Sequence, residues 1–498
     1  MGLGVSGWPL AGAVASTGQM GVVSGAALEV ICARRLQLGD PGGHLRRAFS
    51  LFPVPEVADR VLQAYYIPHG KAANAPFRSV PMFSLQPSVD LQALSVLASF
   101  AEVVLAREAS GGRGSIGVNY MYKMQMPLLS AMYGAMLAGA DAILMGAGSP
   151  DPVPEALARL AEASPASLPI RVHYADAGAS HAVVFAPETV MGVASVPVAR
   201  PKFLAIVSSC DLAQRLAALR PHPPDGFIIE GPTAGGHNAP PRGPRRLDDS
   251  GQPVYGRLDD VPCDEIAALG LPFWLAGSYS SPEALHRACD AGAQGVQVGT
   301  LFALCLESGL TEELRTAVLR QVRQGEATVF TNPVASPTGF PFKEVQIPGT
   351  LSDERVYEAR RRICDVGGLR NPYRTSQGGI GYRCAAEAGP MWVKKSGLER
   401  NAVGRRCLCN ALLANIGLGQ LRVGIPEPAL VTAGSDLRAV ARLLRETDAR
   451  GSVYSAADVV AFLSQSPDGH LRQNVMTRSG LPGFGRPVRP APLDGSPR

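Results

Sequence analysis

Short apolar runs alternate with Ala- and Leu-rich stretches along the first two thirds of the chain. Each run of apolar or β-branched residues leads into a Gly- or Ser-rich turn and then into a segment with helical spacing. This βα alternation is typical of a parallel sheet covered by helices. We predict strands at residues 20–24, 115–119, 142–146, 203–207, 226–230, 272–276 and 295–298.

Helical segments follow these strands. The clearest covers residues 281–291 (SPEALHRACDA), because Ser-Pro-Glu supplies an N-cap and a good first turn. Further helices are expected at 27–36, 91–107 and 310–323, and a hairpin is expected from 170–174 and 181–185.

The pattern predicts an α/β fold, a (β/α)8 TIM barrel with insertions at residues 25–113 and 150–200 and a C-terminal appended region. Only seven strands are found, and Met1-Gly2-Leu3-Gly4 has the composition of a loop that follows a strand. An open barrel would expose two unpaired strand edges. We therefore expect an eighth, first strand to be encoded upstream of residue 1.

The alternation stops near residue 326, which divides the chain into three parts. Residues 1–325 are expected to form the barrel. Residues 326–477 would form a Cys-containing appendage with a few helices, whose cysteine-bearing segment lacks a clear amphipathic period. Residues 478–498, rich in Gly and Pro, would form a disordered tail.

Composition narrows the function classes. Of 498 residues, 46% are hydrophobic and 18% charged, which favours a large buried core. The net charge of +5 is modest and no dense Lys/Arg run occurs, so no nucleic-acid partner is expected. We find no apolar run of membrane-spanning length and no basic region ahead of an N-terminal apolar segment. We therefore expect no membrane association and a cytoplasmic protein whose nine cysteines are reduced.

A histidine follows the strand at 226–230. The sequence FIIEGPTAGGH runs from the strand through Gly235-Gly236 to His237. Catalytic groups of barrel enzymes lie at this end of the strands. The glycines allow close approach of a flat ligand, and a histidine can serve as a general acid or base, or make a structural hydrogen bond.

Two turns of small residues follow in the next two βα units. Gly277-Ser278 ends one strand, and Gly299-Thr300 ends the next. Their exposed backbone N–H groups suit a phosphate, and the loops after the last two strands form the usual phosphate site of these barrels.

These three segments resemble the nitronate monooxygenase family and its relatives, the flavin-dependent enoyl reductases of fatty acid and polyketide synthesis. The family pattern is Glu-Gly-x-x-Ala-Gly-Gly-His, then an Ala-Gly-Gly turn, then Gly-Val-Gln-x-Gly-Thr, and all three occur here in order. The resemblance runs from the first residues to about residue 323.

The resemblance implies FMN as the cofactor. It assigns the catalytic role to His237. It assigns the cofactor contacts to Asn119, Gly235, Gly236, Gly277, Ser278, Gln297, Gly299 and Thr300. The chain departs from the family at Ser278, where a second Gly is usual, and in the longer, more basic loop after His237 that contains Arg242, Arg245 and Arg246.

Four cysteines lie beyond residue 326. Four thiolates could hold zinc or an iron–sulfur cluster, although the spacing matches no common zinc motif and buried structural thiols are the simpler interpretation. These residues are Cys364, Cys384, Cys407 and Cys409.

The leading hypothesis is an FMN-dependent oxidoreductase that oxidises an alkyl nitronate or similar carbanion with O2. An alternative is an NAD(P)H-dependent, trans-acting enoyl reductase on carrier-bound acyl chains, whose basic loop would suit an acidic acyl carrier protein. A third hypothesis, of another class, is a non-catalytic flavin-binding interaction protein. The expected partner is thus a small-molecule or carrier-bound substrate.

Overall fold

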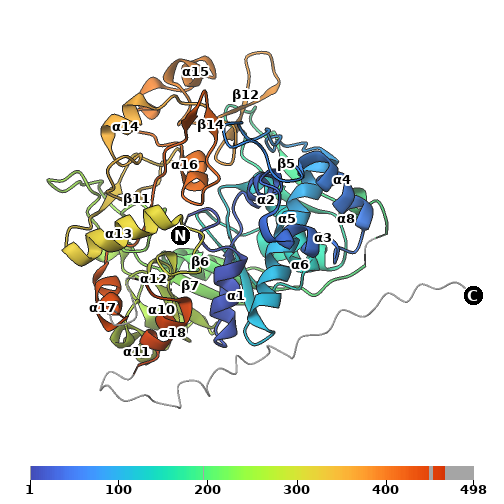
Figure 1. Ribbon diagram of the computed structural model, residues 1–498. Helices are drawn as coiled ribbons and strands as arrows, with labels where there is room; N and C mark the ends of the chain where they lie inside the picture. Colours follow the sequence, from blue (N-terminus) through green and yellow to red (C-terminus); the bar gives the residue numbers. More distant parts are fainter. Residues whose placement is uncertain (1, 195, 448–452, 466–498) are drawn as a thin grey trace, which may run out of the picture.

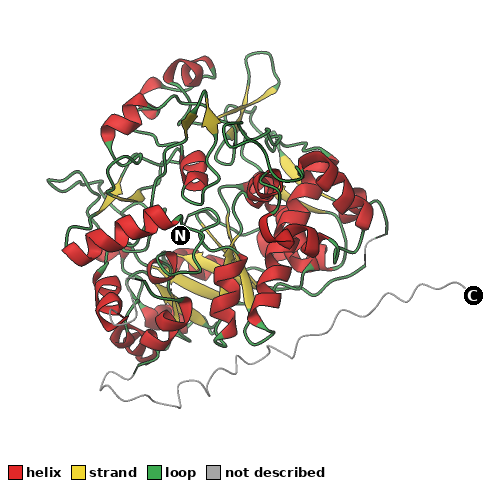
Figure 2. Cartoon of the chain, viewed as in Figure 1, coloured by secondary structure: helices red, strands yellow, loops and turns green. Residues whose placement is uncertain are grey.

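A curled, fully parallel sheet forms the centre of the molecule (Figures 1 and 2). The computed structural model describes residues 2–194, 196–447 and 453–465; the tail predicted at 478–498 lies outside them. Seven strands follow one another in the order β1-β2-β3-β6-β7-β8-β9. Their bounds are β1 Gly21–Ser24, β2 Ile116–Met121, β3 Ala142–Gly146, β6 Lys202–Val207, β7 Gly226–Glu230, β8 Phe273–Ala276 and β9 Val296–Gln297.

The predicted fold class, an α/β barrel with insertions and an appended region, is confirmed by this sheet, and all seven predicted strands are present within two residues of their expected bounds. β1 and β9 are the two edges of the sheet in the described part of the chain. The sheet therefore forms a partial barrel rather than a closed ring.

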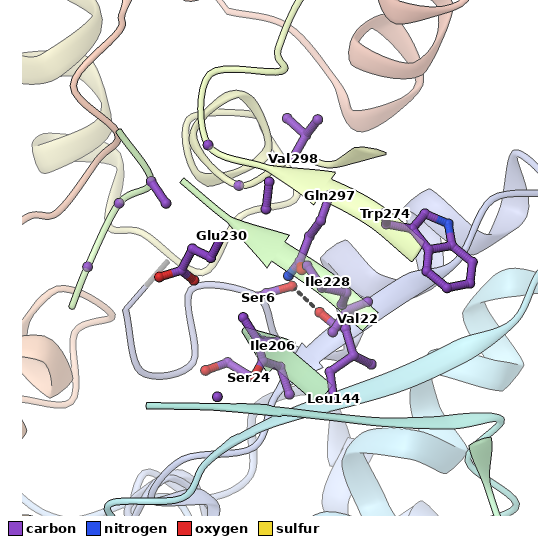
Figure 3. Close-up of a pocket in the computed structure, with 18 of the residues that line it drawn as sticks. Ser6, Val22, Ser24, Leu144, Ile206, Ile228, Glu230, Trp274, Gln297 and Val298 are labelled. Carbon is purple, nitrogen blue, oxygen red and sulfur yellow. Dashed lines mark hydrogen bonds between the residues drawn. The ribbon is translucent and has the colours of Figure 1, made fainter. Parts of the chain in front are cut away.

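The inside of the curled sheet is apolar. Leu144, Ile206 and Ile228 point into it from three neighbouring strands, with Val22 from β1 and Trp274 from β8 (Figure 3). Alternate residues of each strand face this interior because side chains of a strand point to opposite faces. The opposite faces pack against the covering helices, so both sides of the sheet are buried.

Helix α5 (Val89–Ser110) is the central covering helix and packs between α1 and α6. By length and composition it could cross a membrane, which the sequence prediction missed. However, 78% of its most apolar stretch is buried inside the protein, as expected for a core helix. The other covering helices are α1 Trp8–Ser16, α2 Leu28–Gln37, α6 Gln125–Leu137, α9 Cys210–Ala217, α10 Cys263–Ala267, α11 Pro282–Asp290, α12 Thr300–Ala303 and α13 Glu312–Gln324.

Two insertions interrupt the alternation. The predicted hairpin exists, but its first strand is β4, Ala166–Pro169, and not residues 170–174; its partner is β5, Ala182–Phe185. Buried and exposed residues alternate from Ala166 to Val172, so this pattern alone does not set the bounds of the strand; the pairing with β5 does. The insertions also contain η1 Pro41–Gly43, α3 His44–Phe49, α4 Pro55–Tyr65, α7 Val153–Ala161 and α8 Pro187–Met191, and η2 Arg257–Asp259 lies in the loop after β7.

The C-terminal appendage packs on the barrel in two places. The structure describes its residues 326–447 and 453–465. Helices α14, α15 and α16 lie together at one end of the molecule, whereas α17 and α18 lie beside α11 and α12 (Figure 1). Its elements are β10 Val329–Asn332, β11 Phe342–Val345, α14 Glu354–Ala359, β12 Asn371–Arg374, β13 Ile380–Arg383, α15 Gly389–Lys394, η3 Glu399–Asn401, α16 Leu408–Ala414, β14 Leu421–Arg422, β15 Ile425–Pro426, α17 Arg438–Thr447 and α18 Ala456–Leu463.

One of the helices of the appendage, α17, is amphipathic. Helix α17 buries Val440, Leu443 and Leu444 on one face. These side chains share a hydrophobic core with Leu10 and Val14 of α1 and with residues of α12, α13 and α18. The appendage and the barrel are therefore held together by a common core.

Candidate active site

A cavity of about 1820 Å³ opens at the carboxyl ends of the strands and extends down the inside of the sheet. Figure 3 shows Gln297 reaching from β9 toward its middle, near Val22 and Ile228. The sequence predictions come together here, because every predicted site residue lines this one cavity: Asn119, Gly235, Gly236, His237, Gly277, Ser278, Gln297, Gly299 and Thr300.

The turn after β8 has an unusual backbone conformation. Gly277 has φ +92°, and a Cβ built there would lie 3.1 Å from the Gly231 carbonyl oxygen, so the position requires glycine. Ser278 has φ +57°, in the left-handed region that favours glycine. The residue that departs from the family pattern thus keeps the backbone conformation that a glycine would adopt.

The turn after β9 is tied to the appendage. The Thr300 hydroxyl oxygen accepts a hydrogen bond from the Gly434 backbone N–H at 2.9 Å. Gly299-Thr300 and Gly277-Ser278 follow adjacent strands, so their backbone groups border the same end of the cavity.

Sequence reasoning missed the appendage segment 432–435. The Thr432 hydroxyl oxygen accepts a hydrogen bond from the Gly236 N–H at 2.8 Å, and the Ser435 N–H donates to the Thr233 carbonyl oxygen at 3.0 Å. The signal was present, since Thr432-Ala433-Gly434-Ser435 repeats the small-residue pattern of the turn after β8. This segment connects the histidine loop to the second turn.

His237 is fixed by the appendage. Its Nε2 atom lies 2.6 Å from the Ser336 hydroxyl, and its ring packs edge-on against Phe342, with 5.0 Å between ring centroids. Two causes together lower the pKa of His237 from 6.5 to about 3. The larger is burial, and the smaller is the charge of Lys123. The imidazole is therefore neutral near pH 7, which favours a hydrogen-bonding role over that of a strong base.

Three charged side chains surround this histidine loop. Glu230 ends β7, Lys123 follows β2, and Lys343 lies in β11. Burial lowers the pKa of Lys123 to about 6 and that of Lys343 to about 8, and Glu230 opposes both shifts. Burial raises the pKa of Glu230 to about 7, against the attraction of the two lysines. Proton-exchanging groups thus lie beside the cavity, as is common at functional sites.

The basic loop after His237 is partly tied down. Arg242 donates to the Ser208 carbonyl oxygen and lies 3.7 Å from Asp259 in an ion pair. Arg245 and Arg246 are exposed. Burial lowers the pKa of the Arg405 guanidinium, and the charge of nearby Arg245 lowers it by a smaller amount.

The four appendage cysteines lie near one another, since neighbouring thiols contribute to the pKa shifts of Cys364, Cys384 and Cys409. The larger cause is burial, which raises these pKa values and keeps the thiols protonated. Among the described residues, no group of three or more His, Cys, Asp or Glu side chains is placed to hold a metal ion. The metal hypothesis for Cys364, Cys384, Cys407 and Cys409 therefore has no support in this geometry.

The cavity fits a flavin nucleotide in two respects. Gly277 and Gly235 lie where a Cβ would meet neighbouring backbone at 3.1 Å and 2.8 Å, so only glycine lets these loops pack this closely at the edge of the cavity. The space between them and Asn119 on β2 is continuous. Backbone N–H groups of the two turns could hold a phosphate, and the open interior could receive a flat ring system.

Three solved structures are among those to which this chain is similar. FabK from Thermotoga maritima is 13% identical over 73% of this chain and 80% of its own, with a TM-score of 0.39. Nitroalkane oxidase from Streptomyces ansochromogenes is 16% identical over 65% and 85%, with a TM-score of 0.32. The enoyl reductase domain of MlnA from Bacillus amyloliquefaciens is 12% identical over 73% and 84%, with a TM-score of 0.40. No curated protein matches the sequence.

Residues 171–338 match the family model described as nitronate monooxygenase. This segment begins before β5 and ends after β10, so it contains the histidine loop, both small-residue turns and Ser336. The resemblance to the nitronate monooxygenase family, whose members are oxidoreductases, is thereby confirmed for this segment of the chain.

Proposed function

We propose that this protein is an FMN-dependent oxidoreductase that oxidises an alkyl nitronate or a similar carbanion with O2. The observation that carries the proposal is the convergence of His237 and both small-residue turns on one cavity. Lys343, with a pKa of about 8, carries positive charge beside the histidine loop. Lys123, with a pKa of about 6, would take up a proton when an anion binds next to it, so both lysines suit an anionic substrate.

The roles of the residues follow from their positions. Backbone N–H groups at Gly277, Ser278, Gly299 and Thr300 would hold the FMN phosphate, and Asn119 and Gln297 would contact the ring system. When bound, FMN supplies the redox chemistry, taking electrons from the substrate and passing them to O2. Neutral His237, oriented by Ser336, would hydrogen-bond the substrate. A substrate that arrives already ionised needs no strong base, which agrees with the low pKa of His237.

A second candidate is an NAD(P)H-dependent enoyl reductase that acts on carrier-bound acyl chains. It is favoured by the exposed Arg245 and Arg246 in a loop whose Arg242 lines the cavity. Arg405 adds a further positive charge beside Arg245 and donates to the Ser336 carbonyl oxygen, next to His237. Such a rim would attract an acidic carrier protein.

Anaerobic stopped-flow spectroscopy distinguishes these candidates. The purified protein is mixed separately with a nitronate, NADH and NADPH, and flavin absorbance is followed. Bleaching by the nitronate alone supports the proposal, and bleaching by NADPH or NADH supports the reductase. A flavin that none of the three reduces would favour a non-catalytic binding protein, and a protein that takes up no FMN on titration would contradict all three.

A further inference from the structure

The amine of one lysine in the cavity has no hydrogen-bond partner among the described residues. The Nζ atom of Lys123 is buried and unpaired among the described residues, although an ammonium carries three donors. Leaving such a group without an acceptor is costly. Lys123 lines the cavity together with Phe340 of the appendage, and its ammonium lies over the Phe340 ring. The aromatic face offers partial compensation but accepts no conventional hydrogen bond.

Lys123 does not belong to the phosphate turns. It follows β2, whereas the turns follow β8 and β9, and β3, β6 and β7 separate β2 from β8 in the strand order. Its electrostatic neighbours are Glu230 and His237, on the strand end and loop of β7. Lys123 therefore lies with the residues assigned to the substrate.

Glu230 does not use the donors of Lys123. Its charge acts on the lysine, but no hydrogen bond joins the two among the described residues. Lys343, the other nearby lysine, is engaged: it is 1% exposed and donates to the Thr331 hydroxyl oxygen at 2.7 Å. Lys123 is thus the lysine of this group whose donors are free to meet a ligand.

We propose that Lys123 binds the negatively charged oxygens of a planar oxyanion group on the substrate, such as the two oxygens of a nitronate. The inference rests on the proposed function and names the residue that recognises the substrate. Burial lowers the pKa of Lys123 to about 6, and a bound oxyanion favours its protonated form, so the lysine takes up a proton as the anion binds. The resulting ammonium donates to the oxyanion, and the Phe340 ring and the apolar cavity wall receive the alkyl part. This arrangement selects against cationic and neutral substrates of the same shape.

Nitrate is a suitable probe, because it is a planar oxyanion that the enzyme cannot oxidise. Its affinity for the purified protein is measured by isothermal titration calorimetry. We expect Lys123→Gln to weaken nitrate binding by roughly 10- to 100-fold, the loss of one charge-assisted hydrogen bond. Lys123→Arg should retain most of the affinity. Lys394→Gln removes the same charge from an exposed position on α15 and should leave the affinity unchanged.

A second measurement needs no variant. Nitrate should slow reductive methylation of Lys123 in the wild-type protein, followed by peptide mass spectrometry, and should not slow that of Lys394. Nitrate affinity that is equal in wild type and Lys123→Gln, or methylation of Lys123 that nitrate leaves unchanged, would overturn the proposal. Flavin content is recorded for each sample. Absent flavin counts against the proposed function, whereas nitrate binding tests Lys123 separately.

Discussion

Ser278 occupies a backbone conformation that costs a non-glycine residue about 1–2 kcal/mol. A glycine removes this cost, but it also loses more conformational entropy on folding, which offsets part of the gain. We expect Ser278→Gly to raise the free energy of unfolding by roughly 0.5–1 kcal/mol, measured by urea denaturation, with FMN affinity retained because the backbone N–H remains.

Ser280 provides the matched control for this substitution. It lies two residues later in the same loop and has no positive φ. Ser280→Gly should therefore leave stability unchanged or lower it. Equal effects of the two substitutions would show that the conformation of Ser278 stores no strain.

The neutral state of His237 makes stability depend on pH. Its pKa is lowered from 6.5 to about 3 in the folded protein, so the unfolded chain binds the proton first as pH falls. Stability from this group is full above pH 6.5 and is lost progressively toward pH 3. We expect this protonation of the unfolded chain to lower the free energy of unfolding by about 1–2 kcal/mol between pH 8 and pH 5. His237→Asn should show a correspondingly flatter pH dependence in chemical denaturation.

We also expect His237 to contribute to the rate of turnover. His237→Asn and His237→Ala should keep the bound flavin but lower the rate of substrate-dependent flavin reduction by about 10²–10³-fold, the range for loss of a hydrogen-bond donor that stabilises developing charge. Ser336→Ala removes the hydrogen-bond partner of the imidazole and should give a smaller loss. Turnover within a few-fold of wild type in His237→Ala would make the residue structural.

At the scale of elements, the segment 432–435 links the loops after β7 and β9. Thr432→Val removes the acceptor of the buried Gly236 N–H, and an unsatisfied buried donor costs about 1–3 kcal/mol. We expect a loss of stability of that size and weaker FMN binding, followed by thermal unfolding and by flavin fluorescence. The loss of affinity follows because Gly236 borders the cavity.

Thr447→Val is the control for that change. The Thr447 hydroxyl donates to the Leu443 carbonyl oxygen within α17, and Thr447 does not line the cavity. Its replacement should leave FMN affinity as in the wild type. If Thr432→Val also left it unchanged, the segment would have no part in the cofactor site.

At the scale of the whole molecule, the appendage and the barrel share one core. Phe462 of α18 is 1% exposed and belongs to the cluster that includes Leu10 and Val14 of α1. Phe462→Ala should cost about 3–5 kcal/mol. Because the core is common, we expect far-UV circular dichroism and flavin release to shift to the same lower temperature. Two separate transitions would instead show that the appendage unfolds alone. Leu398→Ala, at a 55% exposed position, is the control.

The strands, the fold class and the members of the candidate site could be predicted from the sequence. Each strand of the sheet is a short apolar run bounded by turn residues, and the carboxyl ends of parallel strands meet at one edge, so residues placed after them converge. The hairpin strand was predicted at 170–174 instead of Ala166–Pro169, because the two segments are consecutive and share one alternation of buried and exposed residues, and only the pairing with β5 separates them.

The remaining properties of the site depend on contacts between segments far apart in the chain, so only the tertiary structure decided them. The sequence predicted His237 as the catalytic histidine, but its neutral state comes from burial and from Lys123, 114 positions away. From the sequence, the four appendage cysteines could bind a metal, but their placement among the described residues does not support this hypothesis. The sequence pattern also indicated a separate appendage, whereas Ser336, Thr432 and Gly434 hold the site loops. Local spacing determines which elements form, and packing determines the charge, the contacts and the neighbours of each side chain.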